Sequence, residues 1–518
     1  MTGLRKLPIG IQDFESLKMD GYLYVDKTEQ IYRLISTGRY YFLSRPRRFG
    51  KSLLLSTIKA IFEGKRELFD GLAIAAKPDI TWEKHPVLHL DLNTNKYDSP
   101  EVLDTKLSEA LSQWEIVYDC ARPDLPLGMR FENVIRNAYE QTGLRVVILV
   151  DEYDKPMLQA IGSVELQEAF RATLKGFYGA LKSMDGCIRF AMLTGVTKFG
   201  KVSVFSDLNN LNDISMDADY HDICGISEAE LHSLFAPEIC NMASSNHLTE
   251  EECKAVLRKK YDGYHFNRKS HGIYNPFSVL MCFSKKDFGS YWFETGTPSY
   301  LVYLLQKHDY NLEEMSHQKA TEDVLNSIDA ASTNPIPVIY QSGYLTIKDY
   351  DPRFRTYTLG FPNEEVEEGF TKYLMPCYIS GRDVQSSFRI DNFVMDVEAG
   401  RTEQFIKRLR SLFADPPYEL IQNLENHYRN VVWLLFKLMG FYTQAEYHTS
   451  EGRIDLVVGT PKYCYVMEFK LDGTAEQALA QIQDKNYTLP FEVDGRQIVR
   501  IGISFDSATR NIDQCLVG

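Results

Sequence analysis

A glycine, a lysine and a serine follow one another at positions 50–52, after a short apolar segment and before a helical one. They match the end of the phosphate-binding pattern G-x-x-x-x-G-K-[ST], in which backbone N–H groups at a helix N-terminus hold phosphate. In that chemistry Lys51 reaches the β- and γ-phosphates, and the Ser52 hydroxyl is a ligand of Mg²⁺. Arg45 stands where the pattern has its first glycine. The tripeptide alone is a weak signal, because such runs also occur by chance in loops.

A second motif supplies the missing specificity. Residues 145–152 read RVVILVDE, an apolar run that ends in two acids. Such a run predicts a buried parallel strand with both acids at its carboxyl end. In P-loop ATPases the first acid, here Asp151, holds the Mg²⁺ shell, and the second, here Glu152, polarises the attacking water. A core strand ending in solvated acids competes with this interpretation for one motif alone, but both motifs in this order predict a nucleotide site.

The strand expected at 190–193 ends in Thr194, which suits the polar sensor that such ATPases carry on the strand after the two acids. The alternative is a hydroxyl that bonds its own turn. Lys198 could reach the γ-phosphate or act across a subunit boundary, although a solvated surface lysine is the simpler interpretation. Arg47 and Arg48 could neutralise charge that develops on the phosphates, or could pair with acids on the sheet. The expected nucleotide-binding residues are Arg45, Arg47, Arg48, Phe49, Gly50, Lys51, Ser52, Asp151 and Thr194.

A second group of charged residues is set among apolar neighbours near the carboxyl end of the chain. Asp455 opens the run DLVV, and Glu468 and Lys470 stand in VMEFK. Because strand side chains alternate, Glu468 and Lys470 share one face, and a hairpin would put Asp455 opposite Glu468. Two adjacent carboxylates repel each other unless a divalent cation lies between them, and oxygen ligands suit Mg²⁺ or Mn²⁺. Lys470 could then orient or deprotonate a water.

The alternative for these acids is a polar hairpin of alternating charge. Carboxylates among apolar neighbours are costly without a partner, which favours a site. However, residues 391–518 carry 13 Lys and Arg against 18 Asp and Glu, a net charge of −5, so the sequence predicts no broad basic groove there.

Composition sets the frame for both sites. A length of 518 residues suggests roughly three or four domains. The net charge of −14 argues against a broad nonspecific grip on nucleic acid. No stretch approaches the ~20 apolar residues that span a bilayer, so we expect no membrane association. The nine cysteines are scattered without a C-x-x-C pair, which favours a cytoplasmic protein without a zinc site.

The expected elements alternate strands with helices over the first 220 residues, as in a parallel sheet covered on both faces. Strands are expected at 40–43, 86–92, 146–150 and 188–195, and helices at 52–62, 101–118 and 129–142. A mostly helical segment follows and ends in a hairpin, 343–347 and 355–359, which suggests a winged helix. The last segment is expected to run helix, three strands, helix, strand. The expected domains are therefore 1–220, 221–390 and 391–518.

The first part of the chain resembles the AAA-ATPase-like family of bacterial proteins. The resemblance is carried by KLPIGIQDFESL from residue 6, RPRRFGKS at 45–52, DEYDKP at 151–156 and TGVTKFGKVSVFSDLNNL from residue 194. It continues through DGYHF, YNPFSVL and YWFETGTPSYL, and so covers most of residues 5–390. In that family the first P-loop glycine is also replaced. The resemblance implies a P-loop NTPase fold with a helical and winged-helix-like lid, and ATP and Mg²⁺ as ligands.

The last part resembles the PD-(D/E)XK nuclease superfamily, a restriction-endonuclease-like α/β fold. GRID at 452–455, EFK at 468–470 and ALAQI at 478–482 carry the resemblance. It implies that Asp455 and Glu468 bind metal and that Lys470 joins them in catalysis on DNA or RNA. The accessory residues are Glu425, with Glu446 as the alternative acid, and Gln477 and Gln481.

Three functions remain open from the sequence. The first is an ATP-dependent nuclease or defence-type effector. The second is a regulatory ATPase whose last domain only binds nucleic acid or a protein partner, and the third is a switch that holds ATP and hydrolyses it poorly. Glu152 favours hydrolysis, and the complete set of Asp455, Glu468 and Lys470 favours a nuclease. A homo-oligomer is left open.

Overall fold

The computed structural model groups the chain into two compact units. The first comprises Met1–Thr295 and Lys319–Glu365, and the second comprises Gly296–Gln318 and Val366–Gly518. The residues that the structure describes are 5–198, 210–293, 301, 304–305, 310–312, 314–326, 328, 334–378, 390–413, 424–438, 440, 442–449, 452–493, 495–509 and 511–518. The division into three domains at residues 220 and 390 stays a prediction.

The first unit is built on a five-stranded sheet in the order β2-β3-β4-β1-β5, with every strand parallel to its neighbours. Its strands are β1 (Tyr40–Ser44), β2 (Val87–Asp91), β3 (Val146–Asp151), β4 (Ile188–Gly195) and β5 (Asn212–Asp213). The four longer strands, β1 to β4, lie where the sequence predicts strands and so confirm that prediction. The β4 strand lies between β1 and β3. This is the inserted strand on which such ATPases carry their sensor residue.

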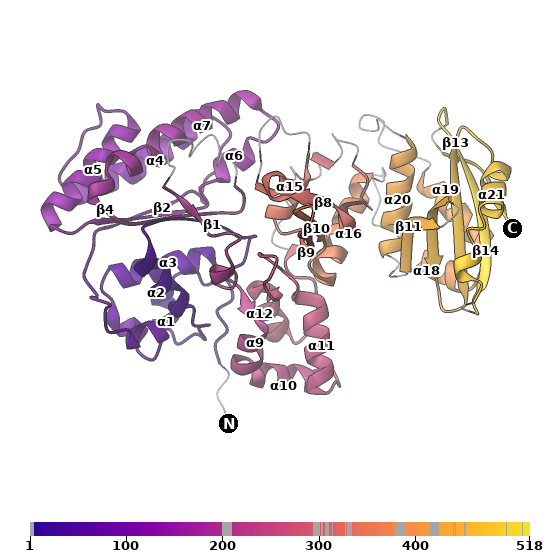
Figure 1. Cartoon of the computed structure of the whole chain (residues 1–518), viewed down its shortest axis with the longest axis horizontal. Helices are drawn as coiled ribbons and strands as arrows, with labels where there is room; N and C mark the ends of the chain where they lie inside the picture. The colour runs from indigo at the N-terminus through magenta and orange to yellow at the C-terminus, as the bar shows by residue number, and fades with distance from the viewer. Residues whose placement is uncertain are drawn as a thin grey trace. The chain divides into compact units, whose positions relative to one another are not determined.

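Helices cover both faces of this sheet, as an all-parallel sheet requires. In Figure 1, α4, α5 and α7 lie on one face and α1, α2 and α3 on the other. Their bounds are α1 (Phe14–Met19), α2 (Thr28–Thr37), α3 (Lys51–Phe62), α4 (Pro100–Val117), α5 (Leu127–Thr142) and α7 (Val164–Tyr178), and two short helices, α6 (Lys155–Gln159) and α8 (Ala180–Ser183), flank α7. The expected α/β class is confirmed, and the expected helices at 52–62, 101–118 and 129–142 are present.

A buried ion pair fixes α4 against α5. Arg130 on α5 donates from Nε and Nη2 to the two carboxylate oxygens of Glu115 on α4, each at 2.8 Å. Its other donors reach the hydroxyls of Ser108 at 2.7 Å and Ser112 at 3.0 Å. Both charged side chains are at most 5% exposed. The Arg130 guanidinium holds the pKa of Glu115 below its usual range.

A helical segment follows the sheet in the first unit. It contains α9 (Glu228–Leu234), α10 (Ala236–Ser245), α11 (Glu250–Tyr261) and α12 (Pro276–Lys285). Capping boxes begin two of these helices, Ser227 with Glu230 for α9 and Thr249 with Glu252 for α11. Apolar side chains of all four helices, among them Leu231, Ile239 and Leu257, share one core.

The segment in which the sequence suggests a winged helix contains, among its described residues, two short helices and a small sheet. The elements are β8 (Lys319–Thr321), α14 (Glu322–Asn326), α15 (Ile336–Gln341), β9 (Thr346–Asp351) and β10 (Thr356–Gly360). The β9 and β10 strands pair antiparallel across the expected turn, and β8 adds a third strand that the sequence did not reveal.

The second unit carries a five-stranded sheet in the order β11-β12-β13-β14-β15. The strands are β11 (Tyr442–Thr449), β12 (Gly452–Gly459), β13 (Tyr463–Leu471), β14 (Gln497–Asp506) and β15 (Asn511–Val517). Only β13 and β14 pair parallel, and α21 (Ala475–Asp484) connects them. With α20 (Leu424–Leu438) ahead of β11, this is the expected order of helix, three strands, helix and strand. The structure adds β15, α18 (Ile390–Glu398) and α19 (Thr402–Leu412).

Among the described residues, no helix has both the length and the apolar character needed to cross a membrane.

The Arg130–Glu115 pair provides a test of the packing of α4 on α5. We expect Arg130→Leu to lower the free energy of unfolding of the first unit by about 3–5 kcal/mol, because it leaves the Glu115 carboxylate buried without its partner. Urea denaturation followed by tryptophan fluorescence measures this, since Trp114 on α4 stacks on Phe131. The double variant Arg130→Leu, Glu115→Leu removes both charges and should lose much less. Equal losses in the two variants would contradict the ion-pair argument.

Candidate functional sites

The loop between β1 and α3 is shaped by two left-handed backbone positions. Arg48 has φ of 67° and Gly50 has φ of 90°. Glycine adopts the left-handed region without steric cost, which explains why it stands directly before the first residue of α3. The loop therefore delivers the chain to the N-terminus of α3, where unpaired N–H groups and the helix dipole favour phosphate.

Lys51 and Glu152 meet at this N-terminus. The Lys51 side chain is buried, its Nζ donates to the Arg45 carbonyl oxygen at 3.1 Å, and it lies 3.3 Å from Glu152 Oε1. Glu152 has φ of 53°, a strained conformation for a residue with a side chain. This backbone conformation turns the chain directly after β3. The second acid of the motif thus faces the P-loop lysine.

Asp151 lies beside the two hydroxyls that the sequence assigned to the same site. Thr194 Oγ1 donates to Asp151 Oδ1 at 2.6 Å, and the Ser52 hydroxyl lies near enough to this carboxylate to lower its pKa. Burial, and then the negative charge of Glu152, raise the pKa of Asp151, whereas the bonds from Ser52 and Thr194 lower it. The tertiary structure therefore brings together the end of β3, the end of β4 and the start of α3.

A third acid, Asp154, clamps the ends of β3 and β4 together, and the sequence argument did not identify it. Its carboxylate accepts from the backbone N–H groups of Val196 and Thr197 at 3.2 and 2.6 Å and from the Thr197 hydroxyl at 2.6 Å. Burial, and then the Glu152 charge, raise the pKa of Asp154 to about 6. A Cβ at Gly195 would lie 2.5 Å from Asp154 Oδ1, so this close approach requires glycine. The signal in the sequence was the third acid of DEYD, at its last position.

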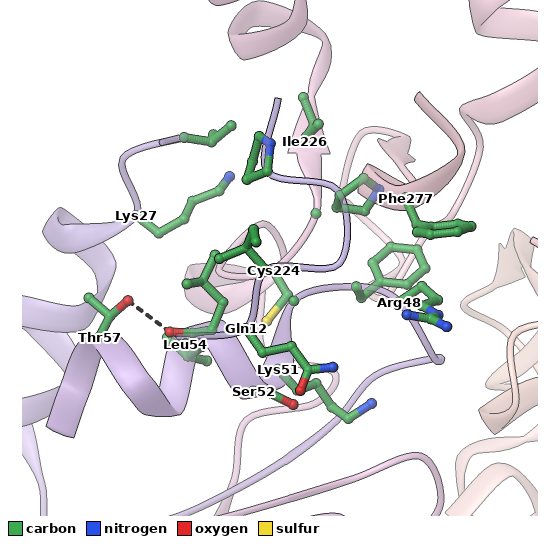
Figure 2. Close-up of a pocket in the computed structure, with 18 of the residues that line it drawn as sticks. Gln12, Lys27, Arg48, Lys51, Ser52, Leu54, Thr57, Cys224, Ile226 and Phe277 are labelled. Carbon is green, nitrogen blue, oxygen red and sulfur yellow. Dashed lines mark hydrogen bonds between the residues drawn. The ribbon is translucent and has the colours of Figure 1, made fainter. Parts of the chain in front are cut away.

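The P-loop opens into a cavity of about 390 Å³ (Figure 2). Lys51, Ser52 and Glu152 line its polar part, and apolar side chains such as Leu54 and Ile226 line the rest. A volume of this size suits a small organic ligand.

Three further loop residues line this cavity. Arg48 lies with its guanidinium 4.8 Å above the Phe277 ring, and Arg47 is half-buried. Phe49 is buried and packs edge-on against Tyr264, with the ring centroids 4.8 Å apart. Arg47 and Arg48 are therefore at the cavity, while Phe49 also anchors the loop in the aromatic core.

Arg45 departs from its expected place beside the phosphates. Its side chain is 1% exposed and donates to the carbonyl oxygens of Ser44, Ser215 and Tyr220 at 2.8–3.0 Å. The guanidinium lies 4.0 Å from the Phe266 ring centroid, and burial lowers the pKa of Arg45 to about 10. Because these carbonyls accept from its two terminal nitrogens on the far side of the loop, Arg45 supports the P-loop and does not line the cavity.

Lys198 also differs from both sequence interpretations, the γ-phosphate contact and the solvated surface residue. It is 4% exposed, and its Nζ contacts Asp213 Oδ2 at 2.9 Å and Asn326 Oδ1 at 2.6 Å. It lines a separate cavity of about 30 Å³ together with Arg45. Lys198 therefore connects the end of β4 to β5 and to the end of α14.

Two residues that the sequence argument missed line the P-loop cavity instead. Lys155 follows the acids of β3, and Asn93 follows the end of β2. Lys155 Nζ donates to Asn93 Oδ1 at 3.2 Å. DEYDKP contained the lysine, but nothing in the sequence indicated that the residue after β2 lies beside it.

In the second unit, Asp455, Glu468 and Lys470 come together on β12 and β13. Leu456 pairs with Met467, and continuing this antiparallel register by one residue puts Asp455 beside Glu468. Asp455 Oδ2 accepts from the backbone N–H of Phe469 at 2.8 Å. Lys470 Nζ donates to Glu468 Oε1 at 3.1 Å.

The two glutamines on α21 have different places. Gln481 donates to Glu468 Oε1 and to the Tyr487 hydroxyl, and it accepts from Lys470 Nζ at 2.7 Å. Gln477 belongs to the capping box of α21 with Thr474, so its side chain is used at the helix N-terminus. Glu425 lies in α20 and Glu446 in β11, and both side chains fall outside the described ones.

Glu468 is a buried carboxyl whose pKa is raised. It is 2% exposed, and burial followed by the Asp455 charge raises the pKa of Glu468 from 4.5 to about 7, while Lys470 lowers it. Its Oε2 is buried without a hydrogen-bond partner in the described structure. Two adjacent carboxylates with such an oxygen fit a hard divalent cation, which prefers oxygen ligands. No group of three or more His, Cys, Asp or Glu placed to hold a metal occurs within the described part of the chain.

Comparison with known proteins agrees with this geometry. A family model described as "Predicted AAA-ATPase" matches residues 8–205, and a model of the PD-(D/E)XK nuclease superfamily matches residues 423–515. A protein of Azotobacter chroococcum mcd 1, described as an uncharacterized protein in the vnfD 5′ region, is 36% identical over 523 residues. The match covers 98% of each chain. The chain therefore belongs to the AAA-ATPase-like family and carries a PD-(D/E)XK nuclease superfamily domain at its carboxyl end.

Proposed function

We propose that this protein binds and hydrolyses ATP in the P-loop cavity, and that its last domain is a divalent-metal-dependent nuclease that ATP controls. The observation that carries the first part is the convergence of Ser52, Asp151 and Thr194 beside the Lys51–Glu152 pair. Bound Mg²⁺ would be held by Ser52 and Asp151, and it would neutralise charge on the phosphates. Lys51 binds the β- and γ-phosphates, and Glu152 orients the attacking water.

Nucleotide binding should also change the partner of Glu152. The Lys51 ammonium now lies 3.3 Å from Glu152 Oε1. A bound phosphate would compete for the lysine, because phosphate offers several charged acceptor oxygens. Glu152 would then be released to face a water, so that hydrolytic competence would follow occupation of the cavity.

The nuclease proposal rests on the buried Oε2 of Glu468. A divalent cation, Mg²⁺ or Mn²⁺, would be held by Asp455 and Glu468, and it would stabilise the charge that develops on a scissile phosphate. Magnesium commonly uses one or two protein carboxylates and takes its other ligands from waters and substrate phosphates. Gln481 holds both Glu468 and Lys470, so the ammonium stays oriented toward the water that it would position. DNA and RNA both offer the required phosphate, and the cytoplasm is the proposed setting.

A regulatory ATPase whose last domain only binds nucleic acid or a protein is the second candidate. The net charge of −5 over residues 391–518 favours it, because a nuclease usually needs basic residues to hold the phosphate backbone. The same metal site would then bind without cutting. The two candidates differ in whether a phosphodiester bond is broken in the presence of metal and ATP.

ATP hydrolysis is tested by Glu152→Gln. We expect this variant to bind ATP and to lose turnover by about 100-fold or more, because the amide cannot accept a proton from the attacking water. Phosphate release measures turnover, and calorimetric titration measures binding. Glu140→Gln, at an exposed position of α5, is the control. Unchanged turnover in Glu152→Gln would refute the role of Glu152.

Nucleic-acid cleavage is tested by Glu468→Gln in the full chain. With Mg²⁺ or Mn²⁺, ATP and mixed DNA and RNA substrates, we expect the wild type to cut and the variant to lose at least about 100-fold in rate, because one metal carboxylate is gone. Glu476→Gln, exposed in the first turn of α21, should cut like the wild type. A wild type that binds these substrates but never cuts them would favour the regulatory ATPase instead.

The raised pKa of Glu468 predicts a pH dependence. A metal must displace the proton from Glu468, so we expect Mn²⁺ affinity to fall about tenfold per pH unit below about pH 7 and to level off above it. Without metal, a rise in pH has the opposite effect on the stability of the domain: it lowers the free energy of unfolding. Since the folded pKa lies above 4.5, the domain should lose stability as pH rises through about 7.

Calorimetric Mn²⁺ titrations at about pH 6 and about pH 8 measure this dependence. Glu468→Gln should weaken binding at both values and remove most of the difference between them. A wild-type affinity that does not change with pH would contradict the assigned proton.

A further inference from the structure

The P-loop cavity carries more positive charge than a single phosphate-binding lysine provides. Arg47, Arg48, Lys51 and Lys155 all line it. Glu152 is the one acid among its lining residues in the described part of the chain. This excess of positive charge suits a ligand with several negative charges, such as a chain of phosphates. Each cation of the cavity could then bind a different phosphate of such a ligand.

Lys155 is set apart from the other cations by its place in the sheet. Lys51 belongs to α3, which follows β1, whereas Lys155 follows β3 and its partner Asn93 follows β2. The sheet order puts β2 on the side of β3 away from β1. Glu152, at the end of β3, therefore stands between the P-loop and the Lys155–Asn93 pair along the carboxyl edge of the sheet.

Lys155 is fixed in this position at both ends. Its backbone N–H donates to the Glu152 carbonyl oxygen at 3.0 Å, so the residue belongs to the turn that carries the second acid. Its Nζ donates to Asn93 Oδ1 at 3.2 Å, which is a neutral oxygen. Burial, and then the nearby charge of Arg47, lower the pKa of Lys155. The ammonium is thus half-buried beside a like charge, and a bound anion would stabilise it.

We propose that Lys155, oriented by Asn93, binds the terminal phosphate of a nucleoside triphosphate and makes this site prefer triphosphate to diphosphate. The inference rests on the proposed ATP site. The terminal phosphate would lie between Lys51 and the acids at the end of β3. It would therefore be the part of the ligand closest to Lys155. Lys51 also reaches the β-phosphate, so it serves both nucleotides, while Lys155 serves only the triphosphate. This gives Lys155 the place that the sequence offered to Lys198.

The test compares ADP with a non-hydrolysable ATP analogue, each with Mg²⁺, in calorimetric titrations of the full chain. We expect Lys155→Gln to bind the analogue about tenfold more weakly and to keep its ADP affinity within about twofold, because only the charge-assisted bond to the terminal phosphate is lost. Lys155→Arg should restore most of the preference. Lys182→Gln, at an exposed position of α8, should leave both affinities unchanged.

Two outcomes would overturn this assignment while leaving the ATP site intact. Equal losses for both nucleotides would show that Lys155 only supports the fold of the cavity. Unchanged affinities for both nucleotides would show that it does not touch the terminal phosphate. A wild type that binds neither nucleotide would refute the proposed ATP site, and this inference with it.

Discussion

Asp151 must remain a usable carboxylate at the end of a strand whose other side chains are all buried, and the first unit is organised around that constraint. Burial raises its pKa, and Glu152 beside it raises the pKa further. The nearby hydroxyls of Ser52 and Thr194 oppose this shift, and the Thr194 hydroxyl donates to the carboxylate. Each hydroxyl comes from a different element, so the start of α3 and the end of β4 both meet β3 at this one acid. For this reason, the contacts that form the nucleotide site also hold the centre of the sheet together.

The same physical problem recurs in the second unit with a different solution. Glu468 is buried next to Asp455, and its partners Lys470 and Gln481 occupy Oε1 but leave Oε2 without a donor. A buried acceptor without a partner costs free energy, so the arrangement is stable only with a proton or a cation on that carboxyl. Both sites thus hold an acid in a dry environment where a divalent ion is the natural counter-charge.

The replaced P-loop glycine has a structural explanation. Arg45 turns its side chain away from the phosphates and bonds three backbone carbonyl oxygens on the other side of the loop. Trp292 donates from Nε1 to the Arg47 carbonyl oxygen at 3.2 Å, and Gly225 donates to the Phe49 carbonyl oxygen at 3.2 Å. The loop is therefore held by side-chain and backbone donors from the helical segment. An arginine suits this supporting position behind the P-loop, because its several donors can bond carbonyl oxygens that would otherwise be buried without partners.

Sequence by itself determined the α/β class, the four longer strands of the first sheet, and the opposition of Asp455 and Glu468. These follow from local patterns: apolar runs, a P-loop ending, two acids after a strand and the alternation of strand side chains. Only the tertiary structure decided where Arg45, Lys155 and Lys198 point. Long cationic side chains can reach in several directions, and their choice depends on acceptors far away in the sequence, such as Ser215, Asn93 and Asp213. Periodicity and spacing along the chain carry no information about those acceptors. The directions of these side chains are therefore determined by the strand order and by the packing of the helical segment.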